Sequence, residues 1–235
     1  MLENVIRSAM DEGAAVENME FEGVVLEGAE LCRAEFNGVR FLRCRFEDCD
    51  LSGVSLFACS FENCSFAGCR FYGAFLKKCR FTECRGDGAN FTGARLRDVQ
   101  FADCGLRYLN LSESSWELGS LRACNLQEVY WSGAKIKKLD FADCDLRRAE
   151  FFRTPLMGVD LSRCDIEGLR VSEGCAELRG LRISAGQAAV RAGPLGVELV
   201  CDGRGSKLPR WLVRAFFTDR ATVWLNAIPS RFLCH

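Results

Sequence analysis

Residues 88–98 read GANFTGARLRD, and in this stretch a large apolar residue returns at every fifth position. The stretches FADCDLRRAEF (141–151) and GVDLSRCDIEG (158–168) repeat the same period. Taking every fifth residue from Val16 to Val171 gives 32 positions, of which 31 are Phe, Leu, Trp, Ile or Val. Neither a helix nor a flat strand can keep this period on one side over such a length. The chain must therefore turn a corner every five residues.

A second series, two residues before each large one, consists almost entirely of small residues such as Ala34, Cys44 and Ala74. The three remaining positions of each unit are mostly polar, and glycine is frequent just before the small residue, as at Gly53 and Gly68. This pattern predicts short sides with one large and one small residue pointing inward and glycine relieving strain at the corners.

The A-(D/N)-L-x-x pattern of these units resembles the pentapeptide-repeat family, and the resemblance covers about two thirds of the chain. It implies an all-β, right-handed quadrilateral β-helix with four units, or 20 residues, per coil and about eight coils in all. At a strand spacing of about 4.8 Å such a rod is on the order of 40 Å long. Short helical caps are expected to cover its two open ends.

The 20-residue coil places seven of the 15 cysteines in one column: Cys44, Cys64, Cys84, Cys104, Cys124, Cys144 and Cys164. A buried thiol behaves as a small apolar group, so core packing is favoured over a redox or metal role. Parallel Cβ atoms about 4.8 Å apart also exceed the usual disulfide separation. The single histidine, His235, excludes His-based triads, and no nucleophile–base pair or phosphate loop is found. We therefore expect a protein without enzymatic activity, metal or cofactor.

Gly86 is the one interruption of the large series. A missing Phe or Leu there would leave a void that costs on the order of 2–5 kcal/mol if unfilled. We expect a local bulge or a shift of neighbouring side chains, and a functional notch is the alternative.

The sequence divides into a helical N-terminal cap (1–13), the repeat region (14–175), a C-terminal cap and dimerisation module (176–200) and a basic amphipathic tail (201–235). Ser184, followed by Gln187, predicts a capping box at the start of a short helix. Residues 182–199 resemble the module through which several bacterial pentapeptide-repeat proteins form two-fold dimers. The interface that this resemblance implies contains Ile183, Ala188, Val190, Leu195, Val197 and Leu199.

The tail carries apolar and aromatic residues among arginines, and residues 176–235 hold nine basic and four acidic residues, a net charge of +5. It is interpreted as an amphipathic segment packed on the coil end or on a partner subunit. The alternative is contact with a membrane surface or a nucleic acid, because basic amphipathic helices bind both.

The whole chain has 31 basic and 32 acidic side chains, yet the 20-residue coil sorts them by side. The five lysines of the repeat region, Lys77, Lys78, Lys135, Lys137 and Lys138, fall on one side, and the next two sides are acidic. Mixed charge is what every soluble repeat protein needs, and a DNA-like acidic surface is the functional interpretation.

The chain also resembles the quinolone-resistance and self-resistance members of the family. This resemblance implies a homodimeric DNA mimic that protects DNA gyrase or topoisomerase IV through Asp103, Asp140, Asp143, Asp145, Asp160 and Asp165. The alternative is a scaffold or effector that docks on proteins or a membrane through its repeat faces and tail. Without a signal peptide or an apolar span of roughly 20 residues, a cytoplasmic protein is expected. As a separate expectation, the protein does not bind nucleic acid directly.

Overall fold

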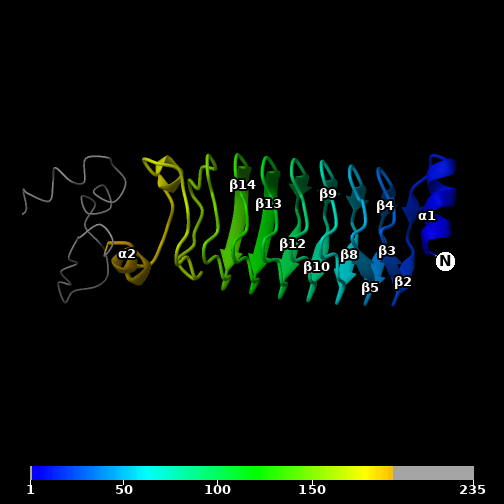
Figure 1. The fold of residues 1–235 in the computed structure, drawn as a ribbon, viewed down its shortest axis with the longest axis horizontal. Coiled ribbons are helices and arrows are strands. Elements are labelled where there is room, and N and C mark those ends of the chain that lie inside the picture. Colours follow the sequence, from blue (N-terminus) through cyan, green and yellow to red (C-terminus); the bar gives the residue numbers. More distant parts are fainter. Residues whose placement is uncertain (1, 193–235) are drawn as a thin grey trace, which may run out of the picture.

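The computed structural model describes residues 2–192, which form a parallel β-solenoid with a helix at each end (Figure 1). The predicted fold class is thus confirmed. Helix α1 (Leu2–Asp11) precedes the solenoid, and a 3-10 turn, η1 (Ala176–Leu178), and helix α2 (Ala185–Ala192) follow it. Within residues 2–192 no helix is long and apolar enough to cross a membrane. The strands are β1 (Val16–Glu17), β2 (Glu20–Glu22), β3 (Val25–Glu27), β4 (Glu35–Asn37), β5 (Arg40–Leu42), β6 (Arg45–Glu47), β7 (Ser55–Phe57), β8 (Ser60–Glu62), β9 (Phe75–Lys77), β10 (Arg80–Thr82), β11 (Arg95–Arg97), β12 (Gln100–Ala102), β13 (Ser115–Arg122) and β14 (Lys135–Ala142).

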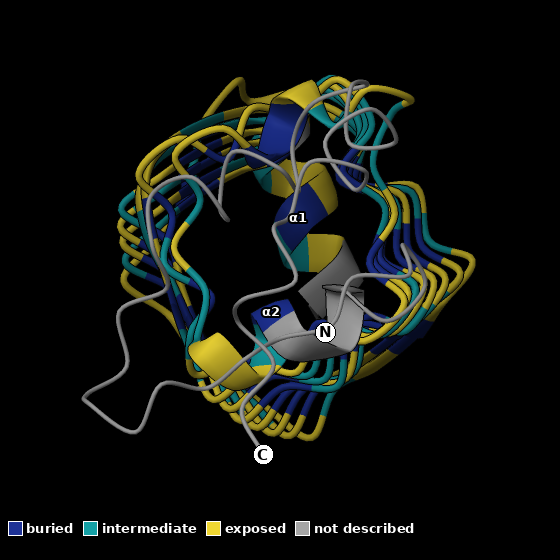
Figure 2. Cartoon of the chain, turned by 90° about the vertical axis from the view of Figure 1, so that its left-hand side faces the viewer, coloured by how far each residue is buried: buried dark blue, intermediate teal, exposed yellow. Residues whose placement is uncertain are grey.

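The register confirms the 20-residue coil. Strands on the same side of neighbouring coils pair in parallel, so that Val16 lies beside Phe36 and Leu26 beside Phe46. Single bridges hold the whole fourth side, beginning with Glu30 and Asp50, and they also hold the third side beyond β6, beginning with Arg45 and Ser65. Viewed along the rod, the coils superpose into one tube whose corners are exposed (Figure 2). Residues 20 apart in sequence are therefore neighbours on the surface.

The core is a set of side-chain columns that run the length of the rod. Phe41, Phe61, Phe81 and Phe101 stack on one another with ring centroids 4.6 to 4.7 Å apart, which matches the separation of neighbouring strands. Ile136 is one of the large residues that the core covers only partly. The periodic large residues thus fill the interior and set the register together.

The corners depend on a left-handed backbone. The residue two positions after each large residue has a positive φ from Asn18 to Gly158. Several of these residues are not glycine, including Leu118 with a φ of 58°. Each such residue costs roughly 1–2 kcal/mol. Backbone hydrogen bonds between coils offset this cost, as where the Arg33 amide donates to the Ser52 carbonyl over 2.9 Å.

At Gly86 the structure confirms a shift of a neighbouring side chain. The Phe66 ring occupies the vacant place, and a Cβ added to Gly86 would lie 2.1 Å from Phe66 Cε2. The backbone does not bulge there, because Arg85 still pairs with Gly105 and the Gly86 amide donates to the Gly105 carbonyl over 2.8 Å. Phe66 thereby closes the position where a notch could have formed.

The cysteine column is buried from Cys44 to Cys164, as predicted. Its thiols donate to backbone carbonyls, as Cys64 does to Phe41 and Glu62, both over 3.3 Å. A hydrogen bond with Cys124 and burial together raise the pKa of Cys144 to about 11. Cys144 is therefore a protonated packing group at neutral pH.

Both ends carry the predicted helices. Ile6 of α1 is buried against the first coil. At the other end the Ser184 amide donates to Gln187 Oε1 over 2.6 Å, and the Gln187 amide donates to Ser184 Oγ over 3.3 Å, which confirms the capping box. Gln187 Nε2 also donates to the carbonyls of Leu161 and Cys164, over 2.8 and 2.6 Å. One side chain thus begins α2 and covers the edge of the last coil.

The 20-residue register does not extend to the end of the 14–175 region. Asp160 pairs with Arg182, 22 residues away, because η1 adds two residues to the last coil. Glu177 is buried in this turn, and its Oε1 accepts a hydrogen bond from the Arg153 amide over 2.8 Å. The regular repeat therefore ends one coil before α2.

Candidate protein-binding surfaces

The six predicted acidic residues lie on two adjacent sides in the C-terminal half of the solenoid. Asp140 lies in β14, and Asp160 occupies the equivalent position in the next coil. Asp103 and Asp143 are corner residues of the same side, with positive φ. The other two are coil neighbours on the adjacent side: Asp145 and Asp165. The structure thus brings all six onto a connected surface.

Arginines compensate four of the six carboxylates. Asp143 pairs with Arg163 over 2.7 Å, and Asp160 pairs with Arg182 over 3.1 Å. Arg147 lies between Asp145 and Asp165, at 2.6 and 3.6 Å. Exposed pairs of this kind contribute little to stability, but they cancel much of the local negative potential.

Two of the paired carboxylates, Asp145 and Asp160, stay ionised at neutral pH because their pKa values are lowered. The Arg147 guanidinium, ahead of other contacts, lowers the pKa of Asp145. The pKa of Asp160 is lowered chiefly by its hydrogen bonds with Ser162, with a smaller contribution from Arg182. The surface is therefore a mosaic of ion pairs with isolated carboxylates between them.

The isolated carboxylates are the feature that the sequence-based selection of six residues missed. Among residues 2–192, the structure records no ion pair for Asp103 or Asp140, and none for Glu62 or Glu83 on the same side. All four side chains are exposed. The 20-residue spacing carries the signal, because it places Arg163 beside Asp143 and Glu83 beside Asp103.

The lysine-bearing side combines cations with exposed aromatic rings. The ammonium groups of Lys77 and Lys78 lie 5.4 and 6.0 Å from the centre of the Phe57 ring. The Arg95 guanidinium lies 5.7 Å from the centre of the Phe75 ring. Such contacts are worth roughly 0.5–1 kcal/mol at exposed sites. They hold the cations over a ridge of apolar surface.

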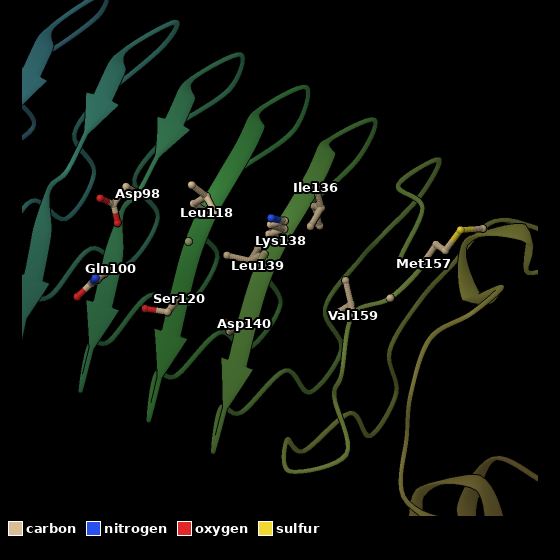
Figure 3. A pocket seen from close by; sticks show the side chains of 12 residues that line it. Asp98, Gln100, Leu118, Ser120, Ile136, Lys138, Leu139, Asp140, Met157 and Val159 are labelled. Carbon is tan, nitrogen blue, oxygen red and sulfur yellow. The ribbon is translucent and has the colours of Figure 1, made fainter.

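A groove of ≈ 630 Å³ runs along the corner between the lysine-bearing and acidic sides. Leu118, Ile136 and Met157 supply its apolar surface, and Asp98 and Asp140 are among its polar lining residues (Figure 3). Met157 is 75% exposed and Leu118 is 47% exposed. These exposures are high for large apolar side chains that gather in one hollow.

The hollow follows from an altered corner. Strands β13 and β14 each run through it for eight residues, whereas their neighbours β11 and β12 are three residues long. Gly119 has no side chain at the small inward position, and Leu139 Cδ1 lies 2.8 Å from where a Gly119 Cβ would be. Leu139 therefore packs inward over Gly119, and the surface above the two strands is left hollow.

The predicted dimer interface is only partly covered by the described residues. Ile183 is half-buried and packs against the core, while Ala188 is buried within its own chain. The side chain of Val190 and all of Leu195, Val197 and Leu199 lie outside the described part, as does the 201–235 tail. The interface remains a prediction.

Metal-ligating side chains do not gather into a cluster within the described part of the chain, residues 2–192. No group of three or more His, Cys, Asp or Glu residues there could hold a metal ion.

Two models of known protein families match this chain. One, described as a pentapeptide repeat region, matches residues 54–131, and the other, described as pentapeptide repeats in eight copies, matches residues 20–53 and 120–151. None of the curated proteins matches the sequence.

Several solved structures are similar to the fold. Full-length QnrB1, a plasmid-mediated fluoroquinolone resistance protein, is 21% identical with a TM-score of 0.44, over 76% of this chain and 100% of that one. A pentapeptide repeat protein from the thylakoid lumen of Arabidopsis thaliana is 18% identical with a TM-score of 0.41, over 48% and 71%. HetL, involved in heterocyst differentiation in the cyanobacterium Nostoc, is 17% identical with a TM-score of 0.24, over 76% and 95%.

Proposed function

From the premise that this chain belongs to the pentapeptide-repeat family, we propose that it is a non-enzymatic binding module whose acidic sides occupy the DNA-binding surface of a bacterial type II topoisomerase. By filling that surface it would protect DNA gyrase or topoisomerase IV from drugs that trap cleaved DNA. The role would be one of antibiotic resistance or self-resistance.

The observation that carries this proposal is the run of exposed carboxylates on one side of the rod that have no ion-pair partner within residues 2–192. Glu62, Glu83, Asp103 and Asp140 lie on this side, which we call the acidic strip. Neighbouring coils rise by about 4.8 Å, and phosphates along one DNA strand repeat every 3.4 Å or so. A surface that neutralises phosphates with Lys and Arg can therefore engage the strip by the same charge–charge contacts.

The proposal is tested by reversing charges on the strip. A variant with Glu83→Lys, Asp103→Lys and Asp140→Lys changes exposed side chains, so its fold should persist. We expect the parent protein to rescue gyrase supercoiling from a quinolone and this variant to lose the rescue. The matched control is the variant with Lys77→Glu and Arg95→Glu on the lysine-bearing side, and this variant should retain the rescue.

Ion pairing predicts unequal roles for the aspartates. Asp140→Asn should weaken topoisomerase binding more than Asp143→Asn, because Arg163 already neutralises Asp143. Binding should also weaken steeply with added salt. If the parent protein neither binds gyrase nor changes its poisoning, the topoisomerase proposal is refuted.

A two-fold homodimer formed through residues 182–199 is part of this proposal. A self-complementary patch at the end of the rod closes most simply into a dimer. Light scattering of the full chain at micromolar concentration should give twice the monomer mass of 26.2 kDa. A monomer would remove the dimer and leave the acidic strip to act alone.

A scaffold that docks on other proteins is the second candidate. The observation that favours it is the ridge of Phe57 and Phe75 with its overlying cations, which the topoisomerase proposal does not use. Loss of function in the Lys77→Glu, Arg95→Glu control would point to this ridge.

A further inference from the structure

The corner groove has three features that a regular coil does not need. The corner residues from Asn18 to Gly158 are all left-handed, but Leu118, with a φ of 58°, is the one large aliphatic residue among them, and its side chain is exposed. At the inward position that small residues usually occupy, Gly119 is smaller than usual and Leu139 is larger than usual. Met157 is left 75% exposed. These features do not improve the core, and they are typical of a surface that another segment covers.

We propose that residues 208–217 of the same chain, LPRWLVRAFF, dock in this groove. The inference does not rest on the proposed topoisomerase function, but both use Asp140, so docking of the segment would compete with topoisomerase binding at that carboxylate. The groove volume of ≈ 630 Å³ falls in the range of pockets that bind drug-sized ligands, which are about as large as a few large side chains. The segment supplies such side chains in Trp211, Leu212 and Phe216.

The charges of the two surfaces are complementary. Asp98 and Asp140 line the groove, and the structure records no ion pair for either within residues 2–192. The segment carries Arg210 and Arg214 and no acidic residue. Arginines that flank apolar side chains can pair with these carboxylates while the rings bind the apolar surface. Lys138 also lines the groove, and its positive charge would repel a strongly basic segment, so an occupant with few, spaced basic residues is favoured.

The chain can reach the groove. The Gly158 amide, at the groove, donates to the Gly180 carbonyl over 3.1 Å, so the groove opens beside the last coil, and α2 begins five residues later at Ala185. From Ala192 to Trp211 there are 19 residues, which span up to about 60 Å when extended. The groove crosses three coil steps, a length of about 15 Å. Distance is therefore no obstacle.

Acrylamide quenching of tryptophan fluorescence in the full chain tests the docking. Trp116 and Trp131 are 1% and 0% exposed, so in a Trp224→Phe background the quencher reports on Trp211. We expect Trp211 to be quenched several-fold less than in a synthetic peptide of residues 206–220. Leu118→Asp with Met157→Asp should raise quenching to the level of the peptide. Tyr108→Asp, at another exposed corner, is the matched control and should leave quenching unchanged.

A photo-reactive benzoylphenylalanine in place of Leu118 identifies the occupant directly. The expected product is a cross-link to residues 206–220 within a species of monomer mass. A cross-link between two chains, or to a different segment, would overturn the proposal. So would a Trp211 that is as accessible in the parent protein as in the free peptide.

Discussion

Replacing Gly86 by alanine tests how the core closes over its one missing large residue. The added Cβ would lie 2.1 Å from Cε2 and 2.8 Å from Cδ2 and Cζ of Phe66, well inside van der Waals contact. The ring cannot swing away freely, because it is 1% exposed and packs edge-on against Phe81 at 5.5 Å and Phe91 at 6.3 Å. Overpacking of this kind costs about 1–3 kcal/mol.

The assay is urea unfolding followed by circular dichroism, with a matched glycine as control. At Gly105 an added Cβ would approach nothing closer than Asp87 Oδ1 at 4.0 Å, so Gly105→Ala should change stability by less than about 0.5 kcal/mol. Phe66→Leu alone should destabilise by leaving part of the space empty. Combined with Gly86→Ala it should cost less than the sum of the two single changes, by about 0.5–3 kcal/mol. A neutral Gly86→Ala, or strict additivity in the double variant, would refute the reasoning.

Three further predictions concern the thiols, the acid range and the buried indoles. Among the described cysteines, thiol labelling of the native protein should modify Cys32 and Cys175, and the eleven buried cysteines should react only after denaturation. Equal labelling in both states would contradict the buried columns. Hydrogen bonds with Ser52, ahead of other contacts including Arg70, lower the pKa of Asp50 from 3.8 to about 2. The stability that ionised Asp50 contributes above pH 3.8 should therefore disappear as the pH falls toward 2. Asp50→Asn should flatten the acid-unfolding curve in that window, and an unchanged curve would show that Asp50 plays no part. Trp131→Phe should destabilise the protein less than Trp116→Phe does. Within the described chain the buried Trp131 indole has no hydrogen-bond partner, whereas the Trp116 indole donates to Ser114 Oγ over 3.1 Å. The reverse order of urea midpoints would count against this account.

The sequence alone determined the features that depend on counting. The five-residue period from Val16 to Val171 requires a corner in every unit, so it predicted both the solenoid and its inward columns. The 20-residue coil that the family resemblance implied then placed Cys44 beside Cys64. The capping box of Ser184 and Gln187 is equally local, because its two hydrogen bonds join residues three positions apart.

The tertiary structure decided the features that depend on how neighbouring coils share space. The glycine at position 86 predicts a vacancy, but only packing determines that the Phe66 ring fills it without a bulge. The corner groove results from Gly119, Leu139 and Met157, which lie on successive coils and are unremarkable one at a time. The potential of the acidic sides likewise depends on which carboxylates meet an arginine, and this requires side-chain positions as well as spacing. A repeat period specifies which residues are neighbours, whereas volumes and pairings at each contact arise from the packed side chains themselves.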